Sequence, residues 1–367
     1  MATQQTDDFM AMKGAGYYSR ATIGAKHVMD NAAGLILDAL DRQPPLDDGT
    51  PFQMTDMGCA DGGTSIDMVG RVLKDVRARC PSRPIQMLYT DLPKNDFSAL
   101  FQIIHGLTDT QSYAEDIDNL YVSSSATSFH KQIVPTDTLD LGHSATASHY
   151  ITEVPAQIED HLHMVRATGA TRAAYEAKGA VDWENFLLMR ARELKSGGLL
   201  ALFNFGIDEE DRWLGHTGGV SMFDRFNAHW RSMADEGRIT EAEYRRTNFP
   251  QVYRTVEQFT APLTLPGPVQ DAGLTLEHVE TRVVRCPFAA AFENGEYASA
   301  AEFAAAYIPT LRSWSEPVFV AGLSERPPAD RAALVDEFYG RYEAEVAADP
   351  TGHGMDYVHC YLICRKL

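Results

Sequence analysis

Two acidic residues of the chain stand at the ends of strand-like apolar segments. Asp56 lies at the end of segment 52–57 and precedes a glycine turn, Gly58-Cys59-Ala60-Asp61-Gly62-Gly63. Asp91 follows segment 85–89, about one strand-helix unit later. The carboxyl ends of parallel strands meet at one edge of a sheet, where nucleoside ligands bind. We therefore expect the two acids to lie at one ligand site.

The turn does not have the pattern of a dinucleotide site. Pyrophosphate-binding turns read GxGxxG, whereas Ala60 stands here in place of the second glycine. An acid inside the turn suits a ligand with positive charge, and the carboxylate of Asp91 can accept hydrogen bonds from two ribose hydroxyls. S-adenosylmethionine (SAM), a sulfonium with an amino acid tail, meets both requirements. The residues favour a methyltransferase, and a plain glycine turn with a structural acid is the alternative.

The overall composition narrows the class of protein. A length of 367 residues predicts one core with large insertions, or two domains, and 44% apolar residues are enough for a packed interior. The net charge of −19 disfavours nucleic acid and anionic membranes as partners. The five scattered cysteines contain no CxxC pair, so we expect neither a disulfide framework nor a metal site. Because no signal peptide or membrane-length apolar run is found, we expect a cytoplasmic protein.

Hydrophobic periodicity predicts an α/β fold that changes character after residue 206. Up to that point, apolar segments alternate with helices, as in a parallel sheet. Strands are expected at 52–57, 85–89, 120–123, 138–142 and 199–205. Beyond residue 206, helical patterns dominate, with no strand expected before 274–284 and a final one at 357–364.

This pattern divides the chain into a sheet domain and insertions. We expect the helical insertions to form a lid over the carboxyl edge of the sheet, where ligands bind in such folds. The expected parts are an N-terminal closing segment and helix (1–50), the SAM-binding α/β domain (51–206), a helical lid insertion (207–268), a sheet strand (269–285), a second lid insertion (286–328), and a C-terminal helix and strand that complete the sheet (329–367).

Four segments in order match the motifs of one known family. They are Met12-Lys13-Gly14 through Tyr18-Ser19, Asp56-Met57-Gly58-Cys59, Asp91-Leu92-Pro93-Lys94-Asn95-Asp96-Phe97, and Ser128-Phe129-His130 through Val154-Pro155. Together they resemble the SABATH family of SAM-dependent methyltransferases, named for salicylate, benzoate and theobromine enzymes. The third segment is the most specific of the four. The resemblance implies a Rossmann-like class I SAM methyltransferase sheet with a helical lid, and a homodimer.

The resemblance also implies which residues contact SAM. Asp91 would bind the ribose and Phe129 would lie beside the adenine, while the segment with Lys13 and Ser19 would close over the cofactor. The full set of implied cofactor residues is Lys13, Ser19, Asp56, Gly58, Asp91, Leu92, Ser128 and Phe129.

The substrate positions depart from the plant pattern of the family. The family glutamine that binds the substrate carboxylate aligns with His27, and the family tyrosine and tryptophan of the fourth segment become Thr146 and Tyr150. His27 and Tyr150 are the expected positioning residues, and an ordinary helix-surface histidine is the alternative for His27. The expected substrate-binding residues are His27, Thr146, His149, Tyr150, Phe223 and Tyr253.

These residues suggest methyl ester formation on a small carboxylic acid, which could be aromatic, fatty or furan-type. A carboxylate is already an anion, so no general base is needed, and catalysis would come from alignment and exclusion of water. The alternatives are N-methylation of a small heterocycle, methylation of a protein carboxylate, and SAM binding without catalysis. A large aromatic lid suits an enclosed small ligand.

Overall fold

A computed structural model describes residues 6, 10, 12, 14, 16–43 and 48–367 of the chain. Its centre is an eight-stranded sheet in the order β3-β2-β1-β4-β5-β8-β7, with β6 paired to β5. The strands are β1 (Phe52–Met57), β2 (Ile85–Thr90), β3 (Leu120–Ser125), β4 (Leu139–Ala145), β5 (Leu194–Ile207), β6 (Arg254–Thr255), β7 (Leu274–Val284) and β8 (Tyr357–Lys366). Strands β1 to β5 run parallel, and β8 is antiparallel to both of its neighbours.

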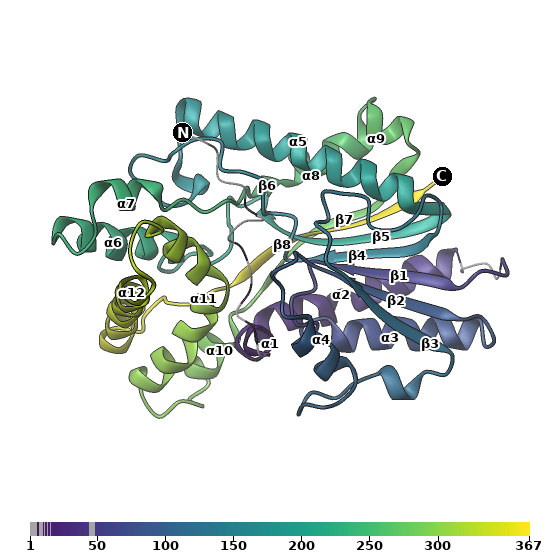
Figure 1. Cartoon of the computed structure of the whole chain (residues 1–367), viewed down its shortest axis with the longest axis horizontal. Helices are drawn as coiled ribbons and strands as arrows, with labels where there is room; N and C mark the ends of the chain where they lie inside the picture. Colours follow the sequence, from purple (N-terminus) through teal and green to yellow (C-terminus); the bar gives the residue numbers. More distant parts are fainter. Residues whose placement is uncertain (1–5, 7–9, 11, 13, 15, 44–47) are drawn as a thin grey trace.

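Helices cover both faces of this sheet, which explains why its central strands are continuous apolar runs. On one face lie α2 (Ile23–Arg42) and α3 (Ile66–Arg79). On the other lie α5 (Gly169–Glu193), α8 (Val256–Thr264) and α9 (Pro268–Asp271) (Figure 1). Buried Trp183 and Phe186 of α5 pack against the strands there. The sheet is thus rigidly enclosed, and its carboxyl edge faces the rest of the molecule.

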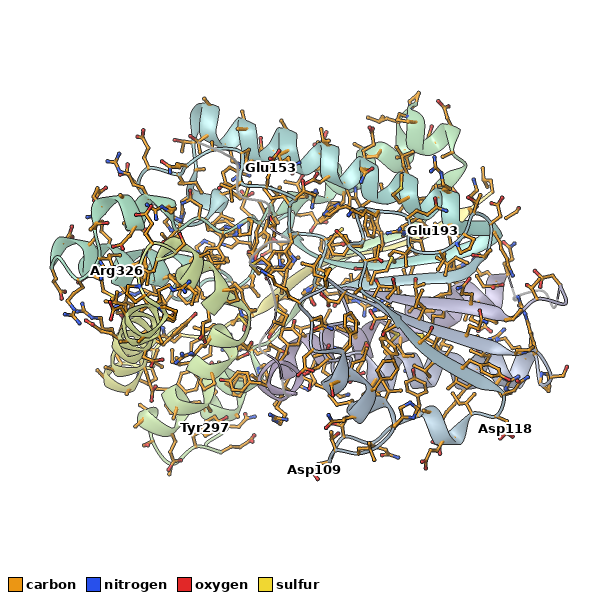
Figure 2. The ribbon with its side chains drawn as sticks, in the orientation of Figure 1. Asp109, Asp118, Glu153, Glu193, Tyr297 and Arg326 are labelled. Carbon is orange, nitrogen blue, oxygen red and sulfur yellow. The ribbon has the colours of Figure 1, made fainter. Side chains whose placement is uncertain are left out.

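A group of helices gathers beyond that carboxyl edge, at the left of Figure 1. They are α6 (Met222–Asp235), α7 (Glu241–Arg246), α10 (Pro287–Glu293), α11 (Ala300–Gly322) and α12 (Pro328–Ala348). Their core is aromatic: Phe226, Trp230 and Phe338 are fully buried and in ring contact. Arg326, labelled in Figure 2, donates two hydrogen bonds to Glu243 of α7 at 2.6 and 2.7 Å. We call this group the lid.

The remaining short helices lie near the carboxyl edge or the chain start. They are α1 (Tyr17–Ala21), α4 (Phe97–Ile104), and two 3-10 turns, Ala114–Asp116 and Met164–Arg166. Helix α1 contacts α11, so the beginning of the described chain reaches the lid. Within the described residues, no helix is long and apolar enough to cross a membrane.

The expected strands are confirmed, with two differences after residue 206. Strand β6 was not expected, because a two-residue strand has no periodicity to recognise. The expected first lid insertion, 207–268, also divides in two. Its first part, with α6 and α7, belongs to the lid, whereas α8 packs on α5 and β7 and covers the sheet. Helix α9, which also packs on α5 and β7, lies almost wholly in the segment expected as a sheet strand, 269–285.

Candidate active site

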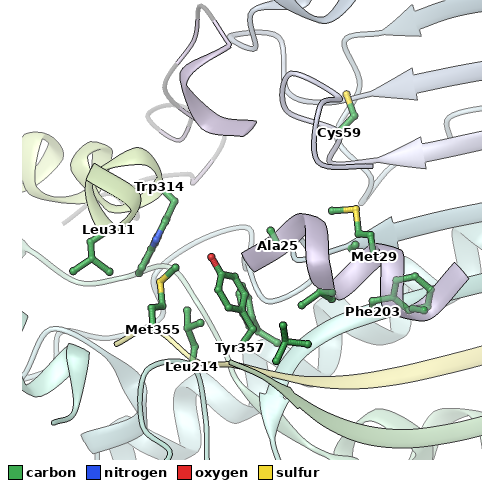
Figure 3. Close-up of a cluster of buried hydrophobic side chains, with 14 of the residues drawn as sticks. Ala25, Met29, Cys59, Phe203, Leu214, Leu311, Trp314, Met355 and Tyr357 are labelled. Atoms are coloured by element: carbon green, nitrogen blue, oxygen red, sulfur yellow. The ribbon is translucent and has the colours of Figure 1, made fainter. Parts of the chain in front are cut away.

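A cavity lies between the carboxyl edge of the sheet and the lid. The empty space between its walls, counted out to its mouth, is about 960 Å³. One end is formed by the turns after β1, β2 and β3, and the other by the segment after β4, by β5 and β8, and by the lid. Figure 3 shows Ala25 of α2, Tyr357 of β8 and Trp314 of α11 in one apolar group, although they are far apart in sequence.

The turn after β1 forms the floor of the first end. Gly58 has φ 80°, and a Cβ at this position would meet the Ala147 side chain at 2.6 Å, so only glycine fits. The Gly58 N–H donates to the Thr90 carbonyl at 2.8 Å and fixes the turn to β2. Ala60, next in the wall, also has a positive φ of 49°. Backbone held in this region often marks a ligand site.

Asp91 lies in the cavity wall directly after β2. One carboxylate oxygen accepts the N–H of Ala60 at 2.7 Å, and the other accepts the N–H of Leu92 at 2.7 Å. Each oxygen keeps a lone pair for a further donor. Burial raises the pKa of Asp91 to about 6, against the two backbone hydrogen bonds, which lower it. The carboxylate is thus preset to accept two hydroxyls, as expected for ribose.

Ser128 and Phe129 also line this end of the cavity. Two side chains of helix α5 hold this loop by hydrogen bonds to its backbone carbonyls. Arg190 donates to the Phe129 carbonyl at 2.7 Å, and Asn185 donates to the His130 carbonyl at 2.7 Å. The Phe129 ring packs edge-on against Phe186, with centroids 5.7 Å apart. A rigid ring is therefore presented at the same end of the cavity as Asp91.

Two of the expected cofactor residues that the structure describes, Asp56 and Ser19, do not line the cavity. Asp56 is buried behind the turn and accepts a hydrogen bond from the Ser65 hydroxyl at 2.6 Å, so its placement fits a structural acid. Burial raises its pKa to about 7. Ser19 uses its backbone N–H to bind Asp61 at 3.1 Å, which ties the N-terminal segment to the turn. Lys13 lies outside the described residues.

The second end of the cavity contains most of the expected substrate residues. Thr146, His149, Tyr150 and Tyr253 all line it. Thr146 has φ 51°, a second non-glycine residue of the wall with left-handed backbone. Phe223 does not line the cavity; it lies behind the wall, stacked on His163 with centroids 3.9 Å apart. It supports the site from the lid side.

The expectation for His27 is not supported, because the residue is exposed on α2 and lies outside the cavity wall. Thr22 and Ala25 are the positions at the start of this helix that face the cavity. Two residues beyond Ala25, the side chain is rotated by about 200°. Lys26 is bound by Asp30 at 2.6 Å and by Asp67, so it brings no free cation to the site. A carboxylate bound in the cavity would therefore not contact His27 in this structure.

Several cavity residues escaped sequence reasoning. Tyr18 lies in the N-terminal motif, and Thr22 is the residue just before α2, so both stand close to segments that the sequence had already singled out. Others have no local signal, because apolar residues in a lid or strand look alike before the fold is known. These are Phe205, Leu214, Trp314, Met355 and Tyr357.

The cavity wall is almost uncharged. Among its described residues, Asp91 is the one with a formal charge. Burial holds the pKa of His149 well below its ordinary value, so this imidazole is neutral. Its Nδ1 atom and the Tyr253 hydroxyl are buried without a hydrogen-bond partner in the described chain. The described residues contain no group of three or more metal-binding side chains. The arrangement offers neutral donors and apolar walls to a bound molecule.

Comparison with known proteins agrees with this geometry. Residues 8–366 match the family described as SAM dependent carboxyl methyltransferase. Indole-3-acetate O-methyltransferase 1 of Arabidopsis thaliana is 25% identical over 57% of this chain and 59% of its own length. The chain thus matches less than two thirds of that relative. Loganic acid O-methyltransferase of Catharanthus roseus is 22% identical over 72% of this chain and 77% of its own length.

The fold has a solved counterpart. The structure of a loganic acid methyltransferase with SAH superposes with a TM-score of 0.74 at 20% identity, covering 97% of this chain and 98% of the other. The match confirms the Rossmann-like sheet with a helical lid. The family match extends over nearly the whole chain and confirms the family expected from the four motifs. The chain belongs to the family of SAM-dependent carboxyl methyltransferases, also called SABATH enzymes.

Proposed function

We propose that this protein transfers the methyl group of SAM to the carboxylate of a small carboxylic acid and releases a methyl ester and S-adenosyl-L-homocysteine. One observation carries the proposal. A single cavity joins the Asp91 and Phe129 end to an enclosed end with Tyr150, His149 and Trp314. A methyl donor held at the first end and an acid held at the second would meet inside it.

The first end fits SAM in three respects. Gly58 lets the turn pack closely against Ala147 in the wall, Asp91 keeps one acceptor site on each oxygen, and Phe129 offers a fixed aromatic face. When bound, SAM supplies an electrophilic methyl group on its sulfonium. The neighbouring phenol of Tyr18 is neutral, since burial raises its pKa to about 12. This end therefore binds and orients the donor without taking part in proton transfer.

The second end suits a carboxylate that needs no activation. A carboxylate oxygen is a nucleophile at neutral pH, so the enzyme has only to hold it in line with the methyl group and keep water out. Tyr150, Tyr253 and His149 offer donors, and Leu214, Trp314 and Met355 exclude water from the described part of the wall. A buried anion is tolerated only when such donors are present.

Two other substrates are less well supported. A buried neutral imidazole could accept a proton from a ring nitrogen, so His149 is the observation in favour of N-methylation of a small heterocycle. A protein carboxylate would have to pass between the sheet edge and the lid, where the Tyr253 side chain is fully buried. The deeply buried wall favours a free small molecule.

The test is a screen of the purified enzyme with SAM and a panel of monocarboxylic acids. Each acid is paired with its carboxamide and with a heterocycle of the same size, and the release of S-adenosyl-L-homocysteine and the methylated product are both measured. The proposal expects methyl esters from at least one group of acids and no product from the amides. Methylation of a heterocycle alone would contradict it.

We also propose that the enzyme is a homodimer, on the basis of the family resemblance alone. Sedimentation equilibrium at several protein concentrations tests this. A mass near 40.6 kDa at all of them would contradict it.

A further inference from the structure

Behind Tyr150 lies a buried glutamine that does not line the cavity. Gln251 has no exposed surface, and its backbone is paired with that of Tyr150 in an antiparallel bridge. The two segments are fixed on both sides, because Ile151 donates to the Pro250 carbonyl at 2.9 Å and Val252 donates to the His149 carbonyl at 2.8 Å. The Gln251 amide is therefore held close to the Tyr150 side chain.

The orientation of this amide follows from His163. The Nδ1 atom of His163 accepts the N–H of Val165 at 3.3 Å, so the ring carries its proton on Nε2. Burial keeps the pKa of His163 well below its ordinary value, and the ring holds one proton only. The Nε2–H then donates to Oε1 of Gln251 at 3.1 Å. Stacking on Phe223 fixes the ring in this position.

Because Oε1 of Gln251 accepts from His163, the Nε2 atom at the other side of the amide points away from His163. It is buried and makes no hydrogen bond within the described chain. Burial is the main influence on the pKa of Tyr150 and raises it, whereas the Gln251 amide acts in the opposite direction and lowers it. A donor beside a phenol oxygen has this effect. Because Tyr150 and Gln251 are directly paired in the bridge, their side chains extend on the same face, and the unused N–H of Gln251 is the donor available to the Tyr150 oxygen.

This geometry fixes what the Tyr150 hydroxyl can do. A phenol oxygen that faces an N–H donor cannot turn its own hydrogen the same way, so its O–H is left to donate toward the cavity. We infer that His163 and Gln251 form a relay that sets the Tyr150 hydroxyl as a hydrogen-bond donor to the carboxylate of the substrate. The inference rests on the proposed function and assigns to it two positioning residues and the selectivity that they create.

The relay explains how an uncharged wall can recognise an anion. Ala25 presents no donor from α2, and the described wall contains no cation. A hydroxyl whose hydrogen points into the cavity favours a partner that can only accept hydrogen bonds, and an ionised carboxylate is such a partner. A carboxamide or a protonated ring nitrogen would bring a second donor toward Tyr150. The substrate selected is therefore the ionised acid in preference to its amide.

The test is a double-mutant cycle on Gln251 and Tyr150, with the wild-type enzyme and the acid found in the screen. Tyr150→Phe removes the donor, and Gln251→Met removes the N–H at similar length. A hydrogen bond to a charged group predicts a fall in kcat/KM of about ten-fold or more for Tyr150→Phe. Gln251→Met is expected to lower kcat/KM by about five-fold, with the SAM dissociation constant unchanged. The double variant should equal Tyr150→Phe alone, because Gln251 acts through the phenol.

Two further measurements separate positioning from structural damage. Asn248→Met is the matched control: Asn248 is a buried amide three residues away that bonds the backbone of Ile158 and Thr247 but does not line the cavity. It should lower the melting temperature and leave the KM for the acid intact. Inhibition by the carboxamide should strengthen relative to the acid in Gln251→Met and in His163→Phe, which keeps the aromatic stack.

Each outcome decides the inference. If Gln251→Met lowers kcat/KM by the same factor in the wild-type enzyme and in Tyr150→Phe, Gln251 does not act through Tyr150. That result would overturn the relay and leave the proposed function standing. Unchanged selectivity between acid and amide in Gln251→Met would do the same. If the wild-type enzyme esterifies none of the acids, the proposed function fails, and the relay falls with it.

Discussion

Asp91 shows how a single side chain can be prepared for a ligand by the backbone around it. Its two oxygens each accept one backbone N–H, from Ala60 and Leu92, so the carboxylate cannot rotate away. In Asp91→Asn, an NH₂ group would face one of these N–H donors and could not accept from the ribose. SAM binding is expected to weaken by about 1.5–3 kcal/mol. Isothermal titration calorimetry on the folded variant measures this.

The control is Asp56→Asn, in the buried acid behind the turn. Its carboxylate bonds Ser65 and lies outside the cavity wall, so its loss should lower the melting temperature and leave SAM affinity within about two-fold of the wild type. If Asp56→Asn weakens SAM as much as Asp91→Asn does, both acids bind the cofactor.

The pKa of Asp91 also predicts a pH dependence. Burial raises it to about 6, so the free site is ionised above pH 6 and protonated below it. Because a ribose diol needs the ionised acceptor, SAM affinity should be complete above pH 6 and fall as the pH falls, by up to about ten-fold per unit. Measurements of the SAM dissociation constant between pH 5 and 8 check that affinity falls toward low pH. The same slope in Asp91→Asn would assign it to another group.

The motifs predicted which turn residues lie together at the sheet edge, but they did not predict the residues that complete the cavity from other elements. Gly58, Asp91, Leu92, Ser128 and Phe129 line the cavity because turns after parallel strands must share an edge. Trp314 and Tyr357 line it as well, yet nothing in their local sequence differs from an ordinary core residue. Trp314 reaches the wall because α11 packs over the sheet edge, and Tyr357 because β8 enters the sheet next to β5.

Helix α2 also shows that local sequence does not reveal which side of an element faces the cavity. A spacing of two residues separates Ala25 in the wall from His27 in solvent. Ala25→Leu would push added carbon atoms into the cavity, toward the substrate, and should lower kcat/KM for the acid at least ten-fold, since overpacking costs about 1–3 kcal/mol. His27→Leu is the matched control with the same new side chain on the exposed face. Steady-state kinetics and SAM titration compare the two.

The expected result is an unchanged enzyme for His27→Leu, because surface substitutions change stability by about 0.5 kcal/mol or less. A loss of acid turnover in His27→Leu with normal turnover in Ala25→Leu would restore the original alignment. That result would also require α2 to present a different face to the cavity from the one described.

Long elements were predictable and short connections were not. Strand β7 has the expected bounds because its apolar pattern is long and ends at clear turns. An apolar helix face, by contrast, does not say which surface it covers, so the segment of α8 was expected in the lid, whereas the segment of α9 was expected to begin a sheet strand. Helix α8 lies on the sheet because its Phe259 and Leu263 fill the space beside Trp183.

At the scale of the whole molecule, net charge opposes the proposed substrate. A charge of −19 repels an anionic acid and attracts the cationic SAM, and both effects act over a distance set by salt. The Debye length falls from about 30 Å at 0.01 M to about 8 Å at 0.15 M. Raising the salt concentration should therefore lower the KM for the acid and raise the SAM dissociation constant, each by about two-fold or more.

The carboxamide of the same acid provides the matched control, because a neutral inhibitor feels no long-range field. Its inhibition constant should stay constant while the KM of the acid falls. A KM for the acid that rises with salt would mean that a local cation outweighs the global charge. Since the described wall contains no cation, such a result would direct attention to the N-terminal segment, where Lys13 lies outside the described residues. Lys13→Met would then abolish the salt dependence and identify the second anchor of the carboxylate.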